Sequence, residues 1–240
     1  MTYVQTEIPF MTDLSQTPLS VISESPKEFG PLHIELCNGI DFTDKNQLPI
    51  VNSVDEIIPE RLSSLHRLKN LSIDRLKGAC VHFFVDDKKI EPLWTKPQFY
   101  AKVLSKFDFV LSTDFSVYME MLRIQKWWND FRNKLLAAYF QRFGVRVIPA
   151  PSWADMEDID RYAEGWPKES LIAINSTGVG YDKLSIHNWL DGYFAMVDIL
   201  KPKHILRYGR MIEGEYLDIS TYYENNNQKG AYYGRKRILL

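Results

Sequence analysis

The chain has few cysteines, no long apolar run and no excess charge. Each of these absences argues against a particular class of protein. Cys37 and Cys80 are the two cysteines in 240 residues, and they lack the C-x-x-C spacing of redox and metal sites. No apolar run approaches the roughly 18 residues of a membrane span, and no secretion signal opens the chain. The net charge of −2 creates no global field for nucleic acid or membranes. A cytoplasmic protein without membrane contact is expected.

Five β-rich segments alternate with stretches of helical periodicity, at 79–87, 108–116, 145–153, 170–178 and 204–209. Each connection is long enough for a helix, so parallel pairing is favoured. The predicted class is α/β, a three-layer, mostly parallel sheet with flanking helices, with a partial (βα) barrel as the alternative. The expected organisation is an N-terminal arm at 1–30, a single α/β domain at 31–222 and a polar, then basic, tail at 223–240.

Outside this alternation, the sequence predicts a strand at 32–37 and a short helix near 58–69. The longest expected helix carries Arg123, Lys126 and Asp130 on its polar face. Its apolar stripe comprises Met121, Ile124, Trp128, Phe131, Leu135 and Ala138.

Arg132 interrupts that stripe, because at 100° per residue it lies only about 40° from Trp128. A guanidinium there needs an anionic partner. We expect Asp108, Asp114 or a helix-end carbonyl in a structural role, or else a bound carboxylate or phosphate that Arg132 clamps.

Polar side chains cluster where the predicted strands end, and parallel strands bring such ends to one edge. Asp114 and Ser116 are two residues apart, so an extended backbone places both on one face. Asp114 is a candidate for binding or catalysis, or a cap of the next helix. Together with Asp86 and Asp155 it forms a candidate Mg²⁺ or Mn²⁺ site, because these metals prefer oxygen ligands.

A turn rich in small polar residues follows the fourth strand and includes Asn175, Thr177 and Gly178. With Trp153 and Tyr208 at neighbouring strand ends, it is a candidate ligand site in which backbone N–H groups hold phosphate. An ordinary glycine turn is the alternative, because neither G-x-x-x-x-G-K-[ST] nor G-x-G-x-x-G is present. Ser116 likewise lacks the G-x-S-x-G context of a nucleophile.

The C-terminal tail carries the one local nucleic-acid signal in the sequence, basic side chains beside tyrosines. These basic residues are Lys229, Arg235, Lys236 and Arg237. Contact with DNA through this tail is one interpretation, and a disordered, solubilising end is the other.

An ordered set of short segments resembles domain-of-unknown-function family 4417 over roughly residues 45–210. The segments are 81–87, 112–116, 128–133, 147–149, Trp153, 177–178 and 208–209. Two positions depart from the family pattern, since Thr113 stands where Pro is usual and Lys134 where Arg is usual. The resemblance implies an accessory protein of phages, plasmids or integrated elements in a bacterial cytoplasm, and it implies no particular reaction.

Three functional hypotheses follow. The first is an accessory protein whose pocket at the strand ends binds a phosphate-bearing ligand or a host protein. The second is a metal-dependent phosphoesterase or nuclease, with Asp86, Asp114 and Asp155 as ligands and Arg132 stabilising phosphate charge. The third is a DNA-binding factor acting through its basic tail.

Overall fold

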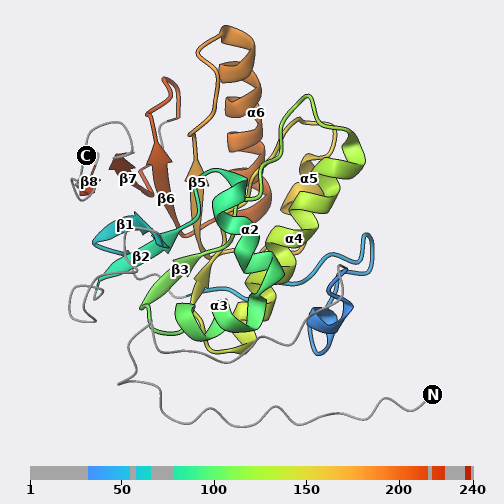
Figure 1. Cartoon of the computed structure of the whole chain (residues 1–240). Coiled ribbons are helices and arrows are strands. Elements are labelled where there is room, and N and C mark those ends of the chain that lie inside the picture. Colours follow the sequence, from blue (N-terminus) through green and yellow to red (C-terminus); the bar gives the residue numbers. More distant parts are fainter. Residues whose placement is uncertain (1–31, 55–57, 66–77, 216–217, 225–235, 239–240) are drawn as a thin grey trace.

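A computed structural model describes residues 32–54, 58–65, 78–215, 218–224 and 236–238 (Figure 1). The strands form two four-stranded sheets whose spatial order follows the sequence. The first contains β1 (Arg61–Ser64), β2 (Ala79–His82), β3 (Phe109–Leu111) and β4 (Val147–Ile148), all parallel. The second contains β5 (Leu171–Asn175), β6 (His204–Gly209), β7 (Ser220–Glu224) and β8 (Lys236–Ile238), and only the β7–β8 pair within it is antiparallel.

Helices connect most of the parallel strands. The helices within the sheets' connections are α2 (Asp87–Thr95), α3 (Pro97–Leu104), α4 (Arg123–Arg142) and α6 (Lys183–Leu200). In addition, the 3₁₀ helix η2 (Ile34–Cys37) precedes β1, and α5 (Ile159–Ala163) lies between the two sheets in the sequence. Pro97 stands in the first turn of α3, where its missing N–H costs nothing. Gly144 adopts a left-handed φ of 75° just after α4 and allows the chain to turn away.

Alternate residues of the central strands face different apolar clusters. Val81, Val110 and Val147 pack with α2, α3 and α4, which lie together against the first sheet (Figure 1). The intervening strand residues form a cluster shared by both sheets, which includes Leu62, Cys80, Phe109, Ile148, Leu171, Leu206 and Tyr223. The sheets therefore turn these faces toward each other, while helices cover the opposite faces.

Contacts across the shared cluster hold the two sheets together. The ring centroids of His82 on β2 and Tyr208 on β6 lie 4.5 Å apart. The Tyr223 hydroxyl donates to the Pro59 carbonyl at 2.6 Å, just before β1. The α/β class with mostly parallel strands and flanking helices is confirmed, and the described strands form no closed barrel.

The polarity of the first half of α4 is opposite to the prediction. Ile124 and Trp128 are exposed, whereas Lys126 and Asp130 are buried. Phe131 is partly buried against the core, and the apolar stripe is buried from Leu135 onward. Ion pairs to the segment around α5 compensate the buried charges, and helical periodicity alone does not reveal such distant partners.

Two short elements near the N-terminal end of the described chain also differ from expectation. Residues 34–37 form the 3₁₀ helix instead of a strand, because His33 adopts a left-handed φ of 49° and only Leu36 turns inward. Residues 61–64 form β1 instead of a helix, because they pair in register with β2. Within the described residues, no helix is both long and apolar enough to cross a membrane.

Candidate functional site

Segments that follow β3, β4 and β5 converge with the first turns of α6 on a pocket of about 240 Å³, here called the strand-end pocket. Its walls include Phe84, Asp114, Ser116, Tyr118, Met119, Glu120, Ser152, Trp153, Asn175, Thr177, Gly178, Gly180, Ser185, Asn188 and Trp189. Six of the predicted site residues line it, namely Asp114, Ser116, Trp153, Asn175, Thr177 and Gly178. The predicted convergence of strand ends is what brings them together.

Asp114 is the most perturbed carboxylate of the strand-end pocket. Burial raises its pKa to about 6, and the negative charge of Asp87 adds to this effect. Hydrogen bonds from the side chains of Asn175, at 3.3 Å, and Ser152 oppose the shift. Asp114 caps no helix in the described chain, because α4 begins nine residues later. It is therefore free to present a carboxylate to the pocket.

Asn175 and the residues around it form a hydrogen-bonded wall of the strand-end pocket. The Asn175 side chain donates to Asp114 and accepts the Thr177 N–H at 2.7 Å. The backbone carbonyl of Asn175 accepts a hydrogen bond from the Trp189 indole at 3.2 Å. The Val179 N–H donates to the Ser176 carbonyl at 3.2 Å. Much of the hydrogen-bonding capacity of this turn is thus used internally.

α6 contributes residues that the strand-end pattern did not identify. Asn188 and Trp189 line the strand-end pocket, and Asn188 donates to the Ala154 carbonyl at 2.8 Å. Gly192 lies against Trp153, and a Cβ at this position would overlap the indole ring. A glycine inside a helix is the one sequence signal of this close approach, since it costs helix stability without such a reason.

The three carboxylates of the predicted metal site do not come together. Asp86 caps α2 by accepting the Lys88 N–H at 2.9 Å. Asp155 pairs with Lys126 at 2.7 Å. The described residues contain no group of three or more His, Cys, Asp or Glu side chains placed to hold a metal ion. Of the three carboxylates that the prediction assigned to Mg²⁺ or Mn²⁺, Asp86 is engaged in a helix cap and Asp155 in an ion pair.

Ser116 has an acidic neighbour that the sequence did not indicate. Its hydroxyl donates to Asp87 at 2.8 Å, and its backbone N–H donates to the same carboxylate at 3.2 Å. This pairing ties the wall of the strand-end pocket to the start of α2.

Arg132 has a structural partner, but not one of those expected. Its guanidinium pairs with Glu91 of α2 at 3.1 Å and donates to Asn129 at 2.7 Å. It also stacks on the Phe115 ring, 3.7 Å from the centroid. Asp108 instead accepts the Gly78 N–H, and Asp114 faces the pocket. Arg132 is not among the residues that line the strand-end pocket.

Tyr208 is buried in the cluster between the sheets and does not line the pocket, although it contacts Phe84, which does. Lys229 and Arg235 lie outside the described residues. Lys236 and Arg237 belong to β8, which extends the second sheet past residue 222. DNA contact through this tail stays a prediction.

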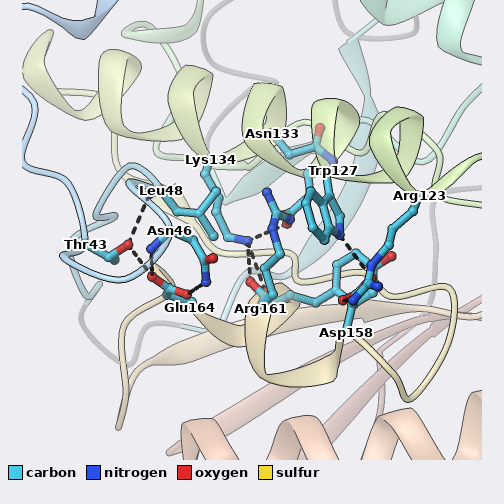
Figure 2. A network of polar contacts seen from close by, with 12 residues as sticks. Thr43, Asn46, Leu48, Arg123, Trp127, Asn133, Lys134, Asp158, Arg161 and Glu164 are labelled. Atoms are coloured by element: carbon cyan, nitrogen blue, oxygen red, sulfur yellow. Dashed lines mark hydrogen bonds and ion pairs between the residues drawn. The ribbon is translucent and has the colours of Figure 1, made fainter.

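A second group of charges lies where α4 meets α5 and the loop at 43–48 (Figure 2). Asp130 pairs with Lys134 and, at 2.9 Å, with Arg161. Lys134 is fully buried and also donates to the Tyr162 carbonyl at 3.1 Å. Burial raises the pKa of Asp130, whereas both cations oppose that change. Each charge has a partner within the chain, which is typical of a structural network.

The same network extends to both ends of α5. Arg123 donates to Asp158 through Nε at 2.9 Å, and the Trp127 indole donates to the same carboxylate at 3.0 Å. Glu164 accepts from the Thr43 hydroxyl and from the Asn46 backbone at 3.1 Å. The network thus ties α4, α5 and the loop at 43–48 together (Figure 2).

Comparison with known proteins identifies the family of this chain. Residues 41–224 match the family described as Domain of unknown function (DUF4417). The chain belongs to this family. The match covers both the strand-end pocket and the buried network, and it confirms the resemblance found in the sequence.

Two relatives are proteins of mycobacteriophages. The Gene 1 protein of Mycobacterium phage L5 is 25% identical over 197 residues, which cover 82% of this chain and 85% of the phage protein. The Gene 1 protein of Mycobacterium phage D29 is 28% identical over 154 residues, covering 64% of this chain and 57% of the phage protein. No solved structure matches the chain significantly. The family is thus associated with phages.

Proposed function

We propose that this chain is a phage-associated binding protein that engages a host protein through the strand-end pocket and catalyses no reaction there. The observation that carries this proposal is the pocket itself, which gathers Asp114, Trp153 and Asn175 at the ends of three neighbouring strands. Exposed apolar side chains surround its mouth. Tyr118 and Met119 line it and are 55% and 46% exposed. Apolar rims of this kind are typical of protein contact sites.

The electrostatics of the pocket favour a protein over a phosphate-bearing ligand. No Lys, Arg or His is among the described residues that line it, whereas Asp114 and Glu120 are. At the first turn of α6, the Asp182 carboxylate already accepts the Ser185 N–H at 2.9 Å. A phosphate would therefore meet carboxylates where it needs donors and positive charge.

The enzyme hypotheses have less support. A metal-dependent phosphoesterase needs converging ligands, which the described carboxylates do not provide. The Ser116 hydroxyl donates a hydrogen bond to the Asp87 carboxylate, but no histidine is among the described pocket-lining residues to act as its base. Binding without chemistry requires neither element.

Affinity capture from a lysate of the bacterial host tests the proposal. Thr177 is exposed at the lip of the strand-end pocket, so Thr177→Trp should cover the pocket while leaving the core unchanged. Lys203 is exposed just before β6, at the opposite ends of the strands, and Lys203→Trp is the matched control. We expect a host protein that both the wild type and the control retain and that Thr177→Trp loses. Equal retention by all three would contradict the proposal.

A further inference from the structure

The strand-end pocket combines aromatic rings with carboxylates, and no Lys or Arg is among the described residues that line it. Among the described residues that line it, the aromatic ones are Phe84, Tyr118, Trp153 and Trp189, and the acidic ones are Asp114 and Glu120. Aromatic faces attract cations through their quadrupoles, and a carboxylate adds a charge-assisted hydrogen bond. This composition is complementary to a positively charged group.

Three cations on segments around the pocket are engaged elsewhere, and the exposed Lys183, two residues before the lining Ser185, is not among the described residues that line the pocket. Lys126 pairs with Asp155, and Arg132 pairs with Glu91. Arg210 lies behind the glycine turn, where it donates to the carbonyls of Val179 and Gly180. Its guanidinium stacks over Tyr181 at 4.0 Å. None of these three cations lines the pocket or faces Asp114 across it.

We infer that the strand-end pocket receives a positively charged side chain of the partner protein, an arginine guanidinium or a lysine ammonium, which binds Asp114 and packs against Trp153. This inference rests on the proposed function, because it names the group that the partner inserts. The volume agrees with it, since about 240 Å³ is below the range of about 300–1,000 Å³ typical of sites for whole small ligands. One side chain is an occupant of the appropriate size.

The surroundings of the pocket indicate how the rest of the partner segment docks. Tyr181 is 81% exposed and Leu184 is 67% exposed, and they flank the lining residues Gly180 and Ser185 in the sequence. Together with Tyr118 and Met119 they provide apolar surface beside the acidic pocket. The complementary segment carries one basic residue with apolar neighbours.

Titration of small side-chain analogues isolates the charge of the inserted group. The probes are butylguanidinium and butylammonium for arginine and lysine, butylurea as the neutral isostere and butyl phosphate as the anion. Binding is followed by tryptophan fluorescence and NMR chemical shifts up to about 50 mM, because fragments of this size bind with a Kd on the order of 1 mM. We expect one or both cations to bind, with butylurea and butyl phosphate at least about tenfold weaker.

The Asp114 carboxylate provides a second readout. Because its pKa is about 6, the ionised fraction, and with it cation affinity, should rise about tenfold between pH 5 and pH 7. Asp87 and Glu120 are the other carboxylates nearby. Asp114→Asn should lose at least about tenfold in affinity and most of the pH dependence. Asp198→Asn, on the exposed face of α6, should bind like the wild type.

Three results would overturn the inference. They are equal binding of butylurea or butyl phosphate, unchanged affinity of Asp114→Asn, and no binding of either cation at about 50 mM. If Asp114→Asn fails to fold, the pH dependence of cation affinity in the wild type tests the inference instead. If no cation binds while Thr177→Trp still abolishes capture of the host protein, the proposed function stands and only the nature of the inserted group is wrong.

Discussion

At the scale of single residues, Asp114 is held in a less polar environment than an ordinary surface carboxylate. It has hydrogen-bond donors in Asn175 and Ser152, but no cation among the residues that line the pocket. A buried carboxylate without a cation favours its protonated form. Sites that bind ligands often retain such costly groups, because the ligand supplies the missing partner.

The raised pKa of Asp114 predicts how stability depends on pH. The unfolded chain loses this proton near the ordinary pKa of 3.8, whereas the folded chain loses it near about 6. Between these values the native state binds more protons, so the free energy of unfolding falls as the pH rises through this interval. Asp114→Asn should remove this loss and stabilise the protein at neutral pH by about 1–3 kcal/mol.

Thermal unfolding measured at about pH 4 and about pH 7 checks this expectation. The gain in midpoint of Asp114→Asn over the wild type should be larger at the higher pH. Asp198→Asn is the control, because Asp198 is exposed on α6 and should show no such difference. A midpoint gain that is the same at both pH values would show that burial of the Asp114 charge is not the cause.

At the scale of elements, α4 is joined to its neighbours by charges as well as by apolar packing. Its C-terminal half buries Leu135, Leu136 and Phe140. Lys126 and Asp130 in its N-terminal half, and Lys134 just past its midpoint, are buried as well and find partners around α5. Such pairs contribute little net stability, but removing one partner leaves a buried charge alone.

Asp130→Asn should therefore be strongly destabilising. The substitution leaves the buried Lys134 ammonium and the Arg161 guanidinium without their shared carboxylate, at a cost of about 3–5 kcal/mol. Asp191→Asn is a matched control, because Asp191 forms an exposed pair with His187 and should cost less than about 1 kcal/mol. Urea unfolding measures both. Similar losses of unfolding free energy in the two variants would show that the buried network contributes no more to stability than an exposed ion pair.

The contact between α6 and Trp153 gives a second prediction at this scale. Alanine is a better helix former than glycine by about 1 kcal/mol, yet Gly192→Ala should destabilise by about 1–3 kcal/mol because its Cβ overlaps the indole. In a Trp153→Ala background the same substitution should be neutral or stabilising. Urea unfolding of the two single variants and the double variant measures this coupling. An equal cost in both backgrounds would exclude the steric cause.

At the scale of the whole molecule, the two sheets share one apolar cluster. Leu206 of β6 belongs to the same buried cluster as Cys80 of β2 and Phe109 of β3. A backbone hydrogen bond from Ala173 to Pro149, 2.7 Å long, also joins β5 to the segment that follows β4. We therefore propose that both sheets belong to one cooperative domain.

Leu206→Ala tests this cooperativity. The fully buried leucine should cost about 2–5 kcal/mol when truncated, and the loss should appear in both sheets. Hydrogen exchange of β2 and β3 amides should accelerate together with that of β5 and β6. Acceleration confined to β5 and β6 would indicate that the sheets unfold separately.

The sequence by itself determined the features that depend on local geometry. The run at 204–209 becomes β6 over the predicted residues, and Pro97 begins α3. The period of two residues places Asp114 and Ser116 together in the wall of the strand-end pocket. These results follow because strand pleat, helical period and proline geometry are properties of a few neighbouring residues.

Only the tertiary structure decided which polar groups are buried and what they bind. Arg132 pairs with Glu91 rather than with the expected aspartates, and Arg161 of α5 compensates the buried Asp130 of α4. Asp86 and Asp155 are taken up by a cap and an ion pair, so the three-carboxylate site does not form. The physical reason is that a charge is buried wherever a partner compensates it, and that partner lies far away along the chain.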